Sequence, residues 1–190
     1  MDNTAATTLE EQRRSLLPTA LIAAAFLIVA IVFCASSNWY ATFKAVHVGF
    51  AAIWIGGGFL LTILGVIAER QNDPQQLAAI AKQAAFVGQK LFSPSAGIVL
   101  VAGIAMMINT NWGWDHFWIT AGLVGFASTF VTGVAVLGPR SHRVDELIRT
   151  VGVEAAETQA AIRQLLLIAR FDVAVLLLVI VDMVVKPFST

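Results

Sequence analysis

Long uncharged, mostly apolar runs make up most of this chain, and short charged segments separate them. Between Arg14 and Lys44 there are 29 consecutive residues without an Asp, Glu, Lys or Arg. Three more charge-free runs, of 24 residues each, follow at 45–68, 91–114 and 116–139. About 20 apolar residues cross a bilayer as a helix. With a fifth apolar run near the C-terminus, the pattern predicts an all-α, polytopic membrane helix bundle with five transmembrane helices at about 17–36, 43–68, 91–109, 116–138 and 165–185.

Composition agrees with this class and excludes others. Hydrophobic residues make up 58% of the 190, charged residues only 13%, and the mean hydropathy is +0.79. Soluble domains carry about 25% charged residues. The 12 basic and 12 acidic side chains cancel, so no basic excess exists for binding nucleic acid. We therefore expect the protein to lie within the lipid bilayer and not to bind nucleic acid.

The distribution of basic residues predicts the orientation. On the five-helix topology, ten Lys and Arg residues fall on one side and only Lys44 and Lys186 on the other. Basic loops stay in the cytoplasm, so we expect a cytoplasmic N-terminus and an external C-terminus. Interfacial aromatic residues gather at the predicted outer ends of the helices: Trp39, Tyr40, Trp112, Trp114 and Trp118.

Residues 16–190 are expected to form one transmembrane domain after a cytoplasmic tail at 1–15. A polar helical segment is predicted at 75–90, after a cap at Asn72-Asp73-Pro74. A second, amphipathic segment at 141–163 is expected to extend two membrane helices or to dock on a partner or at the lipid headgroups. Gly138-Pro139 is expected to end the preceding membrane helix.

One face of the second membrane helix carries the clearest candidate chemistry. Its residues are spaced by three, four, three and four: Lys44, His47, Ala51, Trp54 and Gly58. His47 has three interpretations: a histidine bonded to a neighbouring helix, a ligand of haem b, or a proton-relay or metal group. In the haem interpretation Trp54, Gly57 and Gly58 adjoin the macrocycle, and Met107 or His116 is the second ligand.

Charged residues inside the membrane are costly and therefore candidates for function. Asp182 is expected near the outer end of the last helix, with Lys44 or His47 as its partner. Arg170 and Asp172 are expected near the cytoplasmic end, each pairing elsewhere or snorkelling toward the interface, because residues two apart do not face each other. Two interpretations of Asp182 remain open. It forms an ion pair that serves helix packing, or it belongs to a ligand or proton site.

Small residues predict close contacts between helices. The candidate packing glycines are Gly56, Gly97, Gly103, Gly122, Gly125 and Gly133. The chain lacks the GxSxG, HExxH and phosphate-loop motifs, which favours a protein without enzymatic activity; an enzyme would be a haem-linked oxidoreductase.

Several of these segments resemble the DUF2269 family of predicted bacterial integral membrane proteins. They are Lys44-Ala-Val-His47, Trp54-Ile-Gly56-Gly57, Pro94 with Gly97, Trp118 and Leu137-Gly138-Pro139-Arg140. The resemblance covers about residues 43–170 and implies a multi-pass protein of the bacterial plasma membrane. The His47 to Gly57 stretch is also similar to copper-resistance D proteins and HemJ-type protoporphyrinogen oxidases, which implies a haem or porphyrin ligand at His47. The Trp118 to Gly122 stretch lacks the lysine of those oxidases.

Three functions fit these observations. The first is a non-enzymatic accessory or assembly subunit of a larger membrane transport or respiratory complex, packed against other membrane subunits or further copies of itself. The second is a protein that binds haem b or porphyrin through His47. The third is a copper or small-solute transport component that uses Met106, Met107, His47 and Asp182, with His116 at the same face.

Overall fold

The computed structural model describes residues 21, 24–33 and 35–188, and all its regular elements are helical. The chain divides into two compact units, residues 1–42 and 43–190. In the first unit the short apolar helix Ala24–Phe33 lies within the predicted span 17–36. The beginning of that span, the tail at 1–15 and both arginines of the tail lie outside the described residues. The N-terminal membrane span, the first of the five, therefore stays a prediction.

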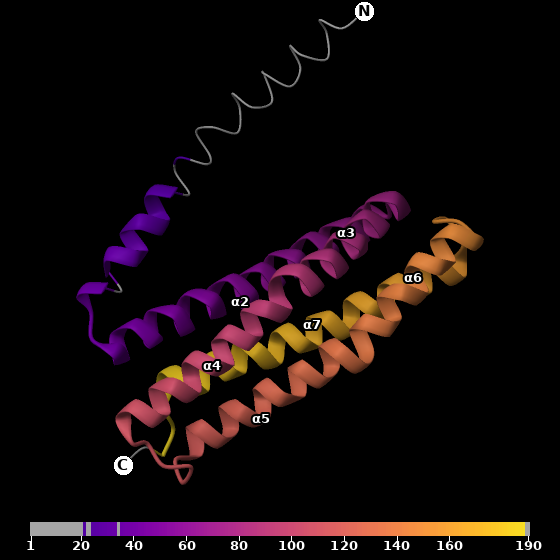
Figure 1. The fold of residues 1–190 in the computed structure, drawn as a ribbon. Helices are drawn as coiled ribbons and strands as arrows, with labels where there is room; N and C mark the ends of the chain where they lie inside the picture. The colour runs from indigo at the N-terminus through magenta and orange to yellow at the C-terminus, as the bar shows by residue number, and fades with distance from the viewer. Residues whose placement is uncertain (1–20, 22–23, 34, 189–190) are drawn as a thin grey trace, which may run out of the picture. The chain divides into compact units, whose positions relative to one another are not determined.

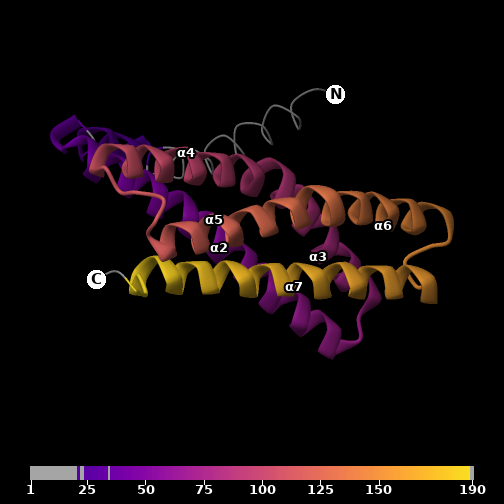
Figure 2. The ribbon, with the colours of Figure 1, turned by 90° about the horizontal axis from the view of Figure 1, so that it is seen from below.

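Four helices are long and apolar enough to cross a membrane, as the hydropathy pattern predicted. The first is α2 (Trp39–Gln71), and the last is α7 (Ala156–Val185). Between them two longer helices run through Pro74–Thr110 and Phe117–Thr150. Figure 1 shows α2 beside the first of these, and Figure 2 shows α7 running along the second. The multi-pass helical architecture is therefore confirmed.

The polar segment expected at 75–90 is α3 (Pro74–Val87), and its start follows the predicted cap. The Asp73 carboxylate accepts hydrogen bonds from the backbone N–H groups of Gln75 and Gln76, both at 3.0 Å. This satisfies two donors that a helix N-terminus leaves without partners. The helix then continues through the π-helical segment η1 (Gly88–Phe92) into α4 (Ser93–Thr110).

The expectation that Gly138-Pro139 ends a helix is wrong. After α5 (Phe117–Val131), a second π-helical segment, η2 (Thr132–Leu137), leads directly into α6 (Gly138–Thr150), with the proline in its first turn. Proline normally breaks a helix because its ring clashes with the preceding turn. Here a wider π turn comes immediately before it, and the N–H of Gly138 donates to the carbonyl of Gly133.

The same solution occurs at Pro94, which follows η1. The amphipathic helix expected at 141–163 is instead divided. It ends with α6 at Thr150, and α7 begins at Ala156, because the chain turns through Gly152 with φ of +94°. That conformation is open to glycine and strained for other residues.

Two apolar clusters lie at opposite ends of the 43–190 unit. One joins α2, α3, α6 and α7 through the buried side chains of Ala68, Leu77, Ala78, Ile80, Ala81, Val144, Ile162, Leu165 and Leu166. The other joins α4 and α5 through Met107, Trp118 and Ile119. In Figure 1 the first cluster belongs to the end labelled α3 and α6, and the second to the end with the α4–α5 turn. The middle of the bundle is left less completely filled.

Candidate functional site

His47 projects from α2 toward α4. Its Nδ1 lies 2.8 Å from the carbonyl oxygen of Val99, 52 residues along the chain. The imidazole ring also lies against Gly103, where an added Cβ would come within 3.1 Å of Cε1. The sequence interpretation of a histidine bonded to a neighbouring helix therefore describes the contact that the structure contains. With Nδ1–H donating to the carbonyl, Nε2 is the nitrogen with a lone pair.

Gly57 and Gly58, which follow Trp54 on α2, each face a side chain of another part of the chain. A Cβ on Gly57 would lie 2.8 Å from Cε1 of Phe92, and a Cβ on Gly58 would lie 3.1 Å from Val173. Gly57 and Gly58 therefore allow η1 and α7 to approach α2. Phe92 and Val173 occupy the space directly over these two glycines, where the haem interpretation places the macrocycle. The Trp54 ring meets Phe126 edge to face, with 5.9 Å between the ring centroids.

The two candidate second haem ligands have other neighbours. Met107 is 9% exposed and packs with Trp118 and Ile119. The His116 ring lies 6.4 Å from that of Trp118. Within the described residues, no ring contact or hydrogen bond joins either side chain to His47, and no three His, Cys, Asp or Glu residues gather into a metal site.

The expected pairing of Asp182 with Lys44 or His47 is not formed among the described residues. Asp182 instead faces α5, where its Oδ2 lies 3.6 Å from the place of a Cβ on Gly122. This oxygen is buried and has no hydrogen-bond partner in the described part of the chain. Lys44 is exposed near the start of α2. His47 faces α4 whereas Asp182 faces α5, so a similar position along the bundle does not bring the two side chains together.

Arg170 pairs elsewhere, as expected, and its partner is Glu69 on α2, with 2.8 Å between Nη2 and Oε1. Both side chains are about one quarter exposed, at 24% and 25%. The sequence interpretation missed Glu69, because the predicted span 43–68 ends one residue before it. Its position at the end of a charge-free helix, opposite in sign to Arg170 and at a similar depth, was the available signal.

The predicted packing glycines divide into two groups. Gly103 contacts His47, Gly122 contacts Met183, and Gly125 contacts Val179, so these three bring helices together. A Cβ added at Gly56, Gly97 or Gly133 would meet nothing within 4 Å. These three therefore make no close helix contact within the described chain.

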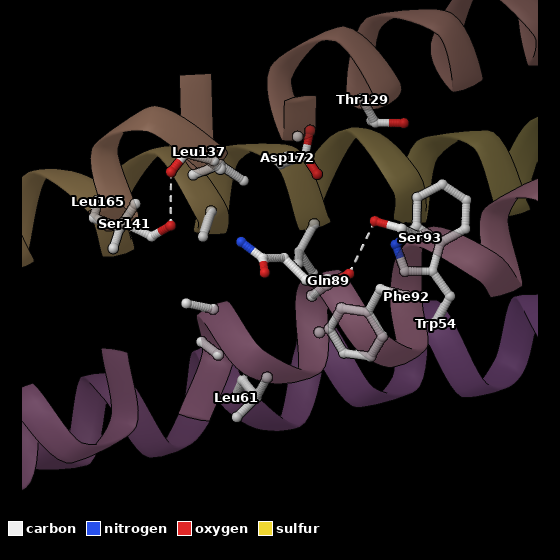
Figure 3. Close-up of a pocket in the computed structure, with 18 of the residues that line it drawn as sticks. Trp54, Leu61, Gln89, Phe92, Ser93, Thr129, Leu137, Ser141, Leu165 and Asp172 are labelled. Atoms are coloured by element: carbon white, nitrogen blue, oxygen red, sulfur yellow. Dashed lines mark hydrogen bonds between the residues drawn. The ribbon is translucent and has the colours of Figure 1, made fainter. Parts of the chain in front are cut away.

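A cavity of about 360 Å³ lies between α2, η1, η2 and α7. Both π-helical segments border it, and Trp54, Gly58, Gly133, Arg170 and Asp172 are among its lining residues. Figure 3 shows Gln89 reaching into this space from η1, with Asp172 on the α7 side and Trp54 on the α2 side. The sequence interpretation did not bring Gln89 into any site, since the residue lies in the segment expected to be cytoplasmic.

Four hydroxyl groups border the cavity, and each donates to a carbonyl of its own helix. The donors are Thr62, Ser93, Thr129 and Ser141, at 2.7 to 3.0 Å. The Trp54 indole, the Gln89 amide and the Asp172 carboxylate make no hydrogen bond with any described residue. The cavity therefore combines an apolar lining with a few uncommitted polar groups, which is the usual character of a small-molecule site.

The comparisons with known proteins agree with this architecture. A family model described as "Predicted integral membrane protein (DUF2269)" matches residues 41–187. The chain belongs to the DUF2269 family. The match begins in the first turn of α2 and extends through α7, so it goes beyond the expected limit near residue 170 and includes Asp172 and Asp182. No curated protein and no solved structure matches the chain.

Proposed function

We propose that this DUF2269 protein is a non-enzymatic accessory or assembly subunit of a larger membrane transport or respiratory complex. One observation carries the proposal: an exposed line of small residues on α2, formed by Ala45, Gly49, Ala52 and Gly56. A Cβ on Gly49 or Gly56 would meet nothing within 4 Å. Helices that face only lipid have no need for small side chains, whereas small residues let two membrane helices approach closely.

The spacing of this small-residue line supports the same role. Its positions differ by four, three and four residues, so they follow one side of the helix. The adjacent Gly57 and Gly58 contact side chains of η1 and α7, on another side. A helix of a second protein is the occupant we propose for the small-residue line, because van der Waals packing against it would replace looser contacts with lipid.

Blue-native electrophoresis after gentle solubilisation tests this proposal. We expect the tagged chain, expressed at its natural level, to migrate with other polypeptides in a complex much larger than its own 20.3 kDa. Gly56→Leu should release it, whereas Ala127→Leu, which places the same leucine side chain at an exposed position of α5, should not. A lone species, or an assembly of this chain alone, would contradict an accessory role.

A second candidate function is binding of haem b at His47. It is favoured by the bond from Nδ1 to the Val99 carbonyl, since a histidine that ligates a metal commonly donates its other N–H to such a group. The contacts at Gly57 and Gly58 speak against a macrocycle over those glycines. An optical spectrum of protein purified from haem-replete cells decides the matter. A Soret band that His47→Ala removes would support the function, and a colourless preparation would exclude it.

The proposed location is the bacterial plasma membrane, with the N-terminus in the cytoplasm and the C-terminus outside. The ten-to-two division of basic residues supports this orientation. The Lys186 ammonium lies over Trp112 and Trp118, 4.6 and 4.8 Å from their centroids, as suits an interfacial end of the bundle. Alkaline phosphatase fused after residue 190 should be active, because the proposed C-terminus lies outside. An inactive phosphatase fusion, together with fluorescence from a fluorescent protein fused at the same place, would reverse the orientation.

A further inference from the structure

The cavity between α2, η1, η2 and α7 is lined by a carboxylate that forms no ion pair within the described chain, although Arg170 also borders the cavity. Asp172 lies on α7, borders the cavity, and forms no ion pair or hydrogen bond with any described residue. The nearest residue of opposite sign along its helix, Arg170, is paired with Glu69 at 2.8 Å. When Glu69, Arg170 and Asp172 are all ionised, their net charge is therefore −1.

A charge in this position is costly inside a membrane, and such residues are retained mainly where they meet a partner or a ligand. Two groups next to the cavity suit a cation. The Trp54 ring borders the space, and an indole face attracts a cation more strongly than any other side-chain ring. The Gln89 amide reaches into the same space and offers its carbonyl oxygen to a donor.

The backbone around the cavity supplies an independent observation. Both π-helical segments, Gly88–Phe92 and Thr132–Leu137, border the same space from different helices. Segments of this kind are rare and occur frequently at functional sites. Here each also ends two residues before a proline, Pro94 or Pro139, that lies in the first turn of the next helix.

The size and lining of the cavity define the rest of the ligand. At about 360 Å³ it lies within the range of about 300 to 1,000 Å³ that small-molecule sites occupy. Most of the remaining lining is apolar, including Phe92, Phe130 and Leu176. We propose that this cavity binds a lipophilic monovalent cation, with its charge beside Asp172 and its apolar body between α2 and α7.

Two ions of the same shape and opposite charge test the proposal directly. Full-length protein in lipid nanodiscs is titrated with tetraphenylphosphonium and with tetraphenylborate, and binding is measured by equilibrium dialysis against empty nanodiscs. We expect tetraphenylphosphonium to bind at least about tenfold more tightly than tetraphenylborate. Equal affinity for both ions would show a purely apolar cavity, and no binding of tetraphenylphosphonium above that of empty nanodiscs would also overturn the proposal.

Two matched variants identify the carboxylate. Asp172→Asn removes the charge with little change of shape and should weaken tetraphenylphosphonium binding by about tenfold or more. Asp182→Asn makes the same change on the same helix, about 15 Å farther along its axis and outside the cavity, and should leave binding within about twofold. Equal losses in the two variants would show that Asp172 is not the counter-ion.

A third variant keeps the test decisive if Asp172→Asn does not fold. Gln89 is exposed and reaches into the cavity, so Gln89→Trp fills the space from a position that tolerates bulk. We expect this variant to lose tetraphenylphosphonium binding while it keeps the elution volume and helical circular dichroism of the wild type. Wild-type binding in a folded Gln89→Trp protein would refute the cavity as the site.

Discussion

Replacing Gly57 by alanine tests the close contact between α2 and the Phe92 ring. The new Cβ would lie 2.8 Å from Cε1 and 2.9 Å from Cζ of Phe92. Carbon atoms normally pack at about 3.5 to 4.0 Å, so the ring has to move by about 0.7 Å or more. Overpacking of this kind costs about 1 to 3 kcal/mol. Alanine also favours a helix over glycine by about 1 kcal/mol, which partly hides that cost.

The neighbouring glycine separates these two effects. Gly56 lies in the same helix, but a Cβ there meets nothing within 4 Å. Gly56→Ala therefore reports the gain in helix propensity alone, and the difference between the two variants isolates the steric cost. We expect Gly57→Ala to be less stable than Gly56→Ala by about 1 to 3 kcal/mol.

Reversible unfolding in mixed dodecyl sulfate micelles, followed by circular dichroism, measures this difference. Adding Phe92→Leu to Gly57→Ala replaces the ring by a smaller side chain and should recover most of the lost stability. The double-mutant cycle then reports the coupling between the two positions. Equal stabilities of the two alanine variants, or no coupling with Phe92, would refute the contact between α2 and η1.

Three further perturbations test individual contacts by the same unfolding measurement. Glu69→Gln should cost about 1 to 3 kcal/mol, because it leaves the guanidinium of Arg170 without its carboxylate, and the loss should shrink when Arg170 is also replaced by methionine. Asp73→Ala should cost about 0.5 to 2 kcal/mol through loss of the α3 cap, with Asp73→Asn recovering most of it. His47→Ala should cost about 1 kcal/mol for the lost bond to the Val99 carbonyl, and a variant as stable as wild type would show that this bond contributes nothing.

The helical class and the four long spans follow from the length of the charge-free runs, because a bilayer leaves few other ways to satisfy the backbone. The cap at Asp73 was also predictable, since Asp followed by Pro is a local signal. The continuity of the helices through Pro94 and Pro139 was not. It depends on π turns whose hydrogen bonds shift by one residue, and no apolar periodicity indicates that shift.

The candidate site shows a different limit of sequence reasoning. Residue type identified His47, Arg170 and Asp172 as unusual in a membrane, yet their partners depend on which helix faces which. His47 bonds a backbone carbonyl, and every residue along a helix offers one of those, so the choice of Val99 leaves no trace in the side-chain sequence. Glu69 lies one residue beyond the charge-free run 45–68, so the apolar pattern does not connect it with Arg170.

The cavity is explained by the way α2 is attached to the other helices. Apolar burial gives little preference for one helix arrangement inside lipid, so polar and close van der Waals contacts decide the arrangement. Near one end, His47 bonds α4; near the other, Glu69 pairs with Arg170 of α7. Between them, Gly57 lies against Phe92 of η1, and Gly58 lies against Val173 of α7. Because α2 is fixed at both ends and contacts its neighbours through glycines in the middle, the space beside Asp172 can persist without collapse of the bundle around it.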